Sequence, residues 1–204
     1  MKSKETTLVL GGSGLLGHHC CVELEKHFNV IQTYNSNTLD MANSEFYSLE
    51  EQSKLESILL RYRPKAIINT IAFVTVDGCE SDPDKAMSMN AGFISYLVEM
   101  MKATGLSESH LIQISSAGIY GVKEGVKKPW EETDQAKPIS VYARTKLEGE
   151  LRAQKHQGPL TILRTDFFGI NPNSEKSLLW WIIDRAARGV TMDGWENIHF
   201  SPVS

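Results

Sequence analysis

Short apolar segments alternate with longer helical segments along this chain, and this alternation limits the possible folds more than any other feature. Segments typical of buried strands lie at Thr7–Leu10, Val30–Thr33, Ala66–Asn69, Leu111–Ser115 and Leu160–Arg164. Segments typical of helices lie at Leu15–Lys26, Ser48–Arg61, Pro83–Ala103, Ser140–His156 and Leu178–Arg188. Strands that alternate with helices form a parallel sheet covered on both faces. The sequence therefore predicts an α/β fold with a doubly wound parallel sheet.

Composition limits the class of protein and its partners. With 204 residues, 41% hydrophobic residues and a net charge of -4, the chain is typical of one globular domain and gives no reason to expect a nucleic acid partner. Cys20, Cys21 and Cys79 are too few for a disulfide framework or a metal cage and favour a reducing compartment. His18 and His19 have no acidic or cysteine partners at ligand spacing, so we expect no metal site. With neither a signal peptide nor an apolar span long enough for a membrane, we expect a cytoplasmic protein without membrane attachment.

Glycines follow the first predicted strand at two overlapping spacings. Gly11, Gly14 and Gly17 fit Gly-x-x-Gly-x-x-Gly, while Gly12, Gly14 and Gly17 fit Gly-x-Gly-x-x-Gly. Such glycines allow a tight turn and the close approach of a pyrophosphate, which the helix N-terminus stabilises. The alternative is a plain glycine-rich turn, but the position between a strand and a helix favours dinucleotide binding. The expected cofactor contacts are Gly11, Ser13, Gly14, Leu15, Leu16 and Gly17.

The end of the second strand bears on the choice between NAD(H) and NADP(H). Thr33-Tyr34-Asn35-Ser36 has no acid to accept the ribose 2′-hydroxyl and no arginine or lysine to bind a 2′-phosphate. This pattern leaves both cofactors open, with a mild preference for NADP(H). Asp40 is expected either to accept a hydrogen bond from the adenine amino group or to be a solvated loop residue.

Tyr142-Ala-Arg-Thr-Lys146 places a phenol and an ammonium one helical turn apart. A nearby ammonium, together with a positively charged nicotinamide ring, lowers the pKa of a tyrosine from its usual value near 10. This pair predicts proton transfer during hydride-transfer chemistry. A chance pairing on a solvated helix face is the alternative.

The order of the motifs resembles that of the extended short-chain dehydrogenase/reductases. The resemblance covers essentially the whole chain and is carried by the glycine turn, Asn69–Ala72, Ser115–Gly121 and the pair Tyr142 and Lys146. Further segments look like the dTDP-4-dehydrorhamnose reductase subgroup; they are Val76–Pro83, Asn90, Pro129–Asp134 and Leu163–Thr165.

The resemblance implies roles for individual residues. Ser116 hydrogen-bonds the substrate carbonyl, Tyr142 is the general acid, and Lys146 binds both Tyr142 and the nicotinamide ribose. Ser115 is the competitor of Ser116, which we favour because it precedes Tyr120 by the family's interval. Asn69 and Ala72 are expected along the cofactor. Asn90 is expected either to join a proton relay or to satisfy a helix carbonyl.

The expected function is an NAD(P)-dependent reductase acting on the keto group of a nucleotide-activated deoxysugar. Ala117-Gly118 follows Ser116 where the reductases have an acid, which favours the alternative of a sugar-nucleotide epimerase or dehydratase with bound NAD. A third alternative is a non-catalytic dinucleotide-binding subunit similar to the beta subunit of methionine adenosyltransferase.

The family has a C-terminal substrate lobe, and Phe200–Ser204 resembles the point at which its members enter it. We therefore expect residues 1–204 to form a single cofactor-binding domain that lacks most of this lobe. Lys123–Lys137 is expected to be an active-site loop. Trp180 and Trp181 cannot both face one core, so one is expected at the interface with the missing lobe or with a second subunit in a homodimer.

Overall fold

Six parallel strands form one sheet in the order β3-β2-β1-β4-β5-β6. The computed structural model describes residues 4–36, 43–51, 53–122, 129–171 and 177–192. The strands are β1 Thr6–Leu10, β2 Asn29–Tyr34, β3 Ser44–Phe46, β4 Ala66–Asn69, β5 His110–Ser115 and β6 Leu160–Arg164. The strand order reverses direction between β1 and β4, where ligands of such sheets bind at the carboxyl ends of the strands. The predicted doubly wound α/β fold is confirmed.

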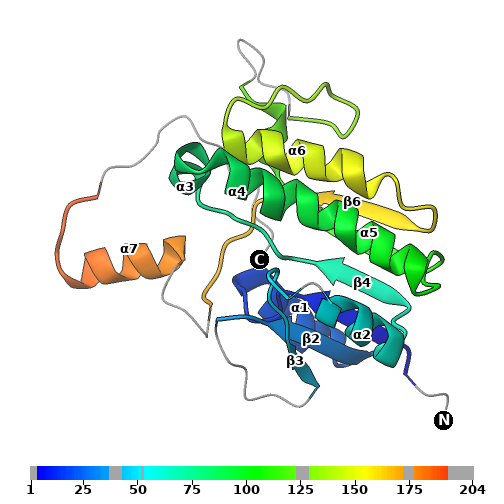
Figure 1. Cartoon of the computed structure of the whole chain (residues 1–204). Coiled ribbons are helices and arrows are strands. Elements are labelled where there is room, and N and C mark those ends of the chain that lie inside the picture. Colours follow the sequence, from blue (N-terminus) through cyan, green and yellow to red (C-terminus); the bar gives the residue numbers. More distant parts are fainter. Residues whose placement is uncertain (1–3, 37–42, 52, 123–128, 172–176, 193–204) are drawn as a thin grey trace.

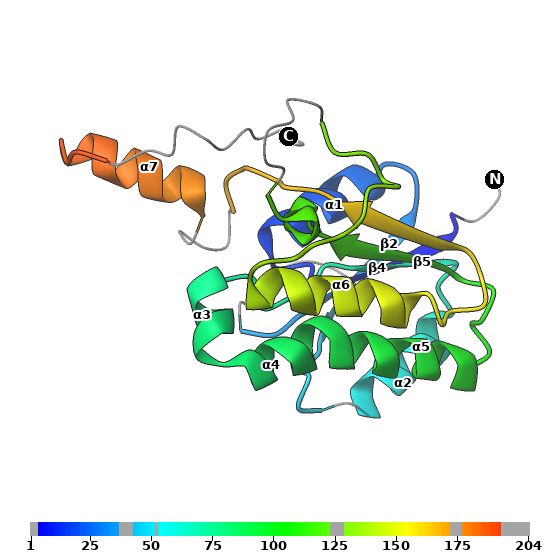
Figure 2. The same ribbon diagram turned by 90° about the horizontal axis from the view of Figure 1, so that it is seen from above.

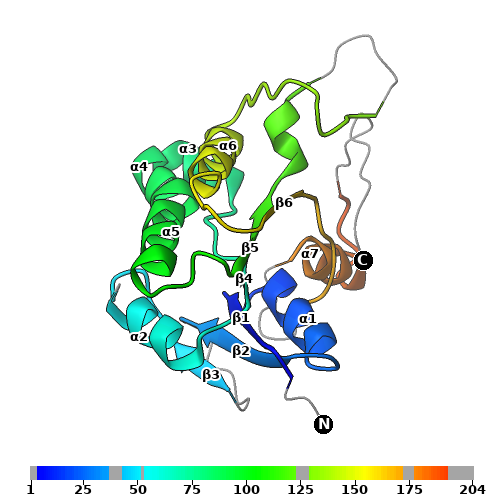
Figure 3. The same cartoon turned by 90° about the vertical axis from the view of Figure 1, so that its right-hand side faces the viewer.

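Helices cover both faces of the sheet (Figure 3). The α-helices are α1 Leu15–Leu24, α2 Ser53–Tyr62, α3 Val76–Ser81, α4 Pro83–Met87, α5 Phe93–Ala103, α6 Val141–Ala153 and α7 Leu178–Ala187. Figure 3 shows α1 on one side of the sheet and α2, α5 and α6 on the other. Two further helical segments are the π-helix η1, Ser88–Gly92, and the 3-10 helix η2, Ala117–Tyr120.

The apolar core follows from the two-residue period of the central strands. Leu8 and Leu10 of β1 face the larger cluster, which includes Leu55, Ile67, Phe93, Leu97 and Leu111. Val9 faces the opposite side with Cys21, Val30 and Ile68. Because both faces are buried, these strands are continuous apolar runs, which explains why they are recognisable in the sequence.

The structure departs from the sequence prediction in a few elements. Ala66–Asn69 and Leu160–Arg164 have the predicted bounds, but α2 begins at Ser53 rather than Ser48. Three short elements were not predicted: β3, α3 and η2. The helix expected over Pro83–Ala103 contains the π-helical segment η1, which places Asn90 in its middle.

Helix α6 packs very closely on η1. A β-carbon on Gly149 would lie 2.5 Å from the carbonyl oxygen of Asn90 and 2.9 Å from Cδ1 of Ile94. Because Gly149 has no side chain, α6 can lie this close to η1 and to the start of α5. This distance matters for the site because α6 carries Tyr142 and Lys146.

Helix α7 lies beyond the carboxyl ends of the strands (Figures 1 and 2). None of the ten residues of α7, all of which the structure describes, is buried. Trp180 is half-buried, whereas Trp181 is 42% exposed and has the Arg185 guanidinium 5.0 Å from its ring centroid. The two tryptophans thus face different surroundings, as their helical spacing requires.

Gly149→Ala should destabilise the fold because its new methyl group meets the backbone of Asn90. We expect a loss of about 1–3 kcal/mol in the free energy of unfolding, measured by urea denaturation. Gly92→Ala is the matched control in a neighbouring helical segment, since its nearest atom is 3.7 Å away. Equal stability of the two variants would contradict this account of the α6 packing.

Candidate functional site

The glycine turn after β1 is held by hydrogen bonds from the neighbouring strands. Gly11 has a φ of +84°, and its N–H donates to Oγ1 of Thr33 at 3.0 Å. The hydroxyl of Thr70 donates to the carbonyl of Leu10 at 2.7 Å, and the N–H of Gly14 donates to the carbonyl of Gly11 at 2.9 Å. The turn is therefore fixed by the carboxyl ends of β2 and β4, although Thr33 and Thr70 had not been predicted in this role.

The turn has the shape that a dinucleotide pyrophosphate needs. A β-carbon on Gly17 would lie 2.2 Å from the carbonyl oxygen of Gly11, so the helix can pack against the turn only with glycine there. A β-carbon on Gly14 would meet only the Gly11 carbonyl, at 3.3 Å, and Gly14 is exposed. No side chain of the described residues caps α1 at Gly14, which leaves the N-terminal amides of this ten-residue helix available for a phosphate.

Asn69 organises the chain after β4. Its Nδ2 donates to Oε1 of Gln113 at 2.9 Å, and its Oδ1 accepts from the N–H of Ile71 at 3.1 Å. These bonds fix the segment that leads to Ala72 at the same end of the sheet as the glycine turn. Asp40, the other residue expected near the adenosine, lies outside the described residues.

The Ser116 hydroxyl lies close enough to the phenol of Tyr142 to lower its pKa. Tyr142 lies in the first turn of α6, which Ser140 caps by accepting from the N–H of Ala143 at 3.1 Å. Ser116 also accepts from the N–H of Gly118 at 3.1 Å. The hydroxyl of Ser115 is buried and has no hydrogen-bond partner among the described residues. Of the two candidate serines, Ser116 is therefore the one in contact with Tyr142.

Burial raises the pKa of Tyr142 above its usual value, whereas the neighbouring ammonium was expected to lower it. The Ser116 hydroxyl acts in the lowering direction, and the charges of Asp166 and Cys79 raise the pKa further. In the protein without cofactor, desolvation thus exceeds the favourable contacts. The phenol consequently remains protonated at neutral pH.

Lys146 is 4% exposed and donates from Nζ to the carbonyl oxygen of Ile114 at 2.7 Å. Burial lowers the pKa of Lys146 to about 8, while the charge of Glu150 raises it. Lys146 is therefore a buried amine that titrates near physiological pH, one turn along α6 from Tyr142.

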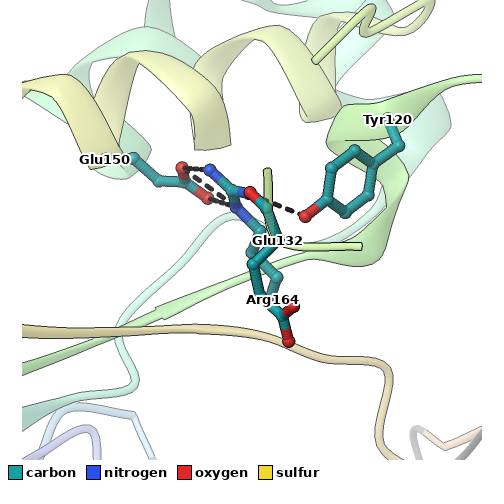
Figure 4. Close-up of polar contacts among 4 residues, drawn as sticks. All are labelled: Tyr120, Glu132, Glu150 and Arg164. Carbon is teal, nitrogen blue, oxygen red and sulfur yellow. Dashed lines mark hydrogen bonds and ion pairs between the residues drawn. The ribbon is translucent and has the colours of Figure 1, made fainter. Parts of the chain in front are cut away.

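Glu150, one turn beyond Lys146 on α6, forms an ion pair with Arg164 (Figure 4). Arg164 donates from Nη2 to Oε2 of Glu150 at 2.8 Å and from Nε to Oε1 at 3.0 Å. Its Nη1 donates to the hydroxyl of Tyr120 at 2.7 Å and to the carbonyl of Glu132 at 2.9 Å. Tyr120 in turn stacks on Trp130 with ring centroids 5.1 Å apart. One guanidinium thus joins α6, η2 and the segment after Pro129.

Asn90 lies between the loop after β4 and α6, in contact with Phe73 and Thr145. Its Oδ1 accepts from the N–H of Phe73 at 2.7 Å, and its Nδ2 donates to the Phe73 carbonyl and to Oγ1 of Thr145, both at 3.0 Å. These bonds tie the loop after β4 to α6. The expected contact with a helix carbonyl is not the one that forms, because the π-helical turn directs Asn90 toward α6 and Phe73.

The described residues contain neither a cluster of metal-binding side chains nor a membrane-spanning helix. No group of three or more histidine, cysteine, aspartate or glutamate side chains there could hold a metal ion, and the ring of His19 instead contacts the carbonyl of Ile170 at 3.0 Å. No helix in the same part of the chain is long and apolar enough to cross a membrane. All three cysteines are free thiols.

The fold and the Ser116, Tyr142 and Lys146 arrangement define a Rossmann-like α/β domain of the extended short-chain dehydrogenase/reductase type. Residues 5–193 match the family described as the RmlD substrate binding domain. Because the match covers most of the sequence, the chain belongs to this family.

Individual relatives and solved structures are similar to this chain over most of its length. The chain is 28% identical to a dTDP-4-dehydrorhamnose reductase of Salmonella typhimurium, over 91% of this chain and 60% of the relative. A crystal structure of a hypothetical dTDP-4-dehydrorhamnose reductase from Sulfolobus tokodaii has a TM-score of 0.76 at 29% identity, over 92% and 63% of the two chains. A Thermotoga maritima UDP-glucose 4-epimerase, crystallised with UDP-glucose, has a TM-score of 0.78 at 27% identity, over 94% and 66%. The chain thus spans about three fifths of the length of these relatives.

The two serines should respond differently to replacement by alanine. Ser116→Ala removes the hydrogen bond from the N–H of Gly118, so we expect a loss of about 1 kcal/mol in the free energy of unfolding. Ser115→Ala removes a buried hydroxyl without a partner and should leave stability unchanged or increase it. Urea denaturation of both variants measures the difference; a larger loss for Ser115→Ala would overturn the assignment.

The buried amine of Lys146 predicts a specific pH dependence of stability. Its pKa is about 8 in the folded protein and 10.5 for an ordinary solvated lysine, so the unfolded chain binds more protons between these values and stability rises with pH there. Relative to Lys146→Met, the unmodified protein should gain up to about 3 kcal/mol between pH 7 and pH 10.5. Urea denaturation across this range tests the sign, and parallel stability curves for the two proteins would contradict it.

Proposed function

We propose that the complete protein is an NAD(P)-dependent reductase that acts on the keto group of a nucleotide-activated sugar. The observation that carries the proposal is the proximity of the Ser116 and Tyr142 hydroxyls, one helical turn from buried Lys146. This group lies at the carboxyl ends of the strands, as does the glycine turn. The similarity to dTDP-4-dehydrorhamnose reductases supports a sugar nucleotide as the substrate class.

Each side chain has a distinct task in the proposed reaction. A bound nicotinamide supplies the hydride. The hydroxyl of Ser116 donates a hydrogen bond to the substrate carbonyl oxygen, and the phenol of Tyr142 gives that oxygen its proton. The ammonium of Lys146 binds the cofactor ribose and stabilises the resulting phenolate. The raised pKa of Tyr142 fits this direction of reaction, because a general acid must begin protonated.

The glycine turn is the proposed pyrophosphate site, with Gly11, Ser13, Gly14, Leu15, Leu16 and Gly17 along the phosphates. The uncapped start of α1 and the free space at Gly14 support this placement. Asn69 and Ala72 would follow the nicotinamide side, and Asp40 the adenine. We propose NADP(H) as the preferred cofactor because the end of β2 carries no acid.

The remaining expectations concern the protein as a whole. We propose that residues 1–204 form one cofactor-binding domain that works with a substrate lobe, since the relatives are longer than this chain. A cytoplasmic location and a homodimer also remain our proposals; the three free thiols support the location.

A sugar-nucleotide epimerase is the second candidate function. It is favoured by Ala117-Gly118 after Ser116 and by the similarity to the Thermotoga maritima epimerase. Such an enzyme would keep NAD through each turnover, whereas a reductase must exchange its cofactor. Absorbance and mass spectrometry of the purified protein distinguish the two, because tightly retained NAD would favour the epimerase.

Cofactor binding and chemistry can be tested separately. We expect both NADPH and NADH to change the tryptophan fluorescence on titration, with tighter binding of NADPH. Gly14→Asp should weaken binding at least about tenfold by placing a negative charge at the phosphate site, without a large loss of stability. Absence of binding to either cofactor would refute the proposed function.

Tyr142→Phe in the complete protein tests the chemistry. Turnover of a dTDP-4-keto sugar should fall by at least about a thousandfold, because the proton donor is gone, while cofactor affinity stays within a few-fold. Unchanged turnover would remove Tyr142 from this role. Binding of cofactor without turnover by the unmodified complete protein would instead favour the non-catalytic dinucleotide-binding subunit.

A further inference from the structure

Glu150 is a carboxylate in an unusual place, the buried face of α6. It is 1% exposed and lies one helical turn beyond Lys146 and two turns beyond Tyr142. A buried carboxylate needs compensation by an opposite charge or by hydrogen bonds. The proposed reaction assigns no task to Glu150, so its burial requires another explanation.

Arg164 holds this carboxylate in a fixed orientation. Two nitrogens of the guanidinium donate to the two oxygens of Glu150, at 2.8 Å and 3.0 Å, in the planar geometry shown in Figure 4. The remaining nitrogen is bound by the hydroxyl of Tyr120 and the carbonyl of Glu132. Arg164 is thus fixed by three segments, and the Glu150 carboxylate cannot leave its position without breaking several bonds.

Glu150 is the charged group on α6 that influences the buried amine of Lys146. The Lys146 ammonium has a neutral carbonyl, that of Ile114, as its hydrogen-bond acceptor, and burial disfavours its charge. The carboxylate of Glu150 opposes this effect. The other titratable and charged groups around this part of α6 are Tyr142 on the same helix, Arg164 on β6, Tyr120 on η2, Asp166 after β6, and Cys79 on α3.

We propose that Glu150 is a positioning residue which, held by Arg164, supplies the negative charge that keeps the buried side chain of Lys146 in its ammonium form. The proposal rests on the proposed function, in which Lys146 acts as a cation. Arg164 has two tasks, since it fixes the carboxylate and anchors the Tyr120 segment. The network therefore links the charge of the site to the segment that follows Ser116.

Two variants separate this electrostatic role from a structural one. Glu150→Gln removes the negative charge beside Lys146, so the amine should lose its proton at a lower pH. Arg164→Met removes the positive charge that offsets Glu150, so the amine should keep its proton to a higher pH. Both variants break the same ion pair. A merely structural role predicts the same response from both, whereas the charge predicts opposite responses.

The direct measurement is a pH titration of the protein labelled with carbon-13 at the lysine Cε, followed by NMR. The Lys146 resonance is identified by its loss in Lys146→Met. Relative to the unmodified protein, we expect its midpoint to fall by roughly 1–2 pH units in Glu150→Gln and to rise in Arg164→Met. The matched control is Glu148→Gln, which breaks the ion pair of Glu148 with Arg152 on the same helix, at 2.8 Å, and should leave the midpoint unchanged.

An unchanged midpoint in Glu150→Gln, or shifts of the same sign in the Glu150 and Arg164 variants, would overturn the proposal. If Glu150→Gln does not fold, Arg164→Met decides alone, because a lowered or unchanged midpoint there also overturns it. The titration needs neither cofactor nor substrate, so its result is independent of the proposed function. A cofactor titration at pH 7 and pH 9 then tests the link, since affinity should fall at a lower pH in Glu150→Gln than in Glu148→Gln.

Discussion

The buried face of α6 carries polar side chains, and the arrangement of the site depends on the hydrogen-bond and ion-pair partners that these side chains find. Thr145, Lys146 and Glu150 are all buried, and an apolar neighbour could not compensate any of them. Each one finds its partner on a different segment: Asn90 in η1, the Ile114 carbonyl in β5 and Arg164 in β6. Because these partners lie on three separate elements, they fix the rotation and the depth of the helix together.

This requirement connects the fold to the chemistry. A helix held by apolar contacts alone can be repacked with similar energy in more than one way. A helix held by directional bonds has few alternatives, since each missing bond leaves a buried polar group without a partner. Tyr142 lies on this helix, so its distance to Ser116 follows from contacts deeper in the protein. The glycine turn is fixed in the same manner, by Thr33 in β2 and Thr70 directly after β4.

The sequence predicted the parts of the structure that depend on local patterns. The central strands are continuous apolar runs because both faces are buried, and the glycine turn and the Tyr142 and Lys146 pair have characteristic spacings. The strand Ser44–Phe46 was missed because it is a three-residue edge strand with a polar start. Contacts such as that of Arg164 with Glu150, or of Asn90 with Phe73, join segments whose proximity is set by the tertiary fold. The effect of burial on the Tyr142 pKa could not be predicted for the same reason, since burial is a property of the packed molecule.

The π-helical turn Ser88–Gly92 affects how sequences of this kind are compared. A π-helical turn contains more residues than an α-helical one, so it changes the angular phase of every residue that follows it. Asn90 can thereby face α6 while Phe93 and Ile94 face the apolar core. A regular α-helix that directs the same residues toward α6 and toward the core would have one residue fewer in this turn. An alignment of this chain with such a helix therefore requires a one-residue gap within this turn, and without it every later core position would be paired with the wrong residue.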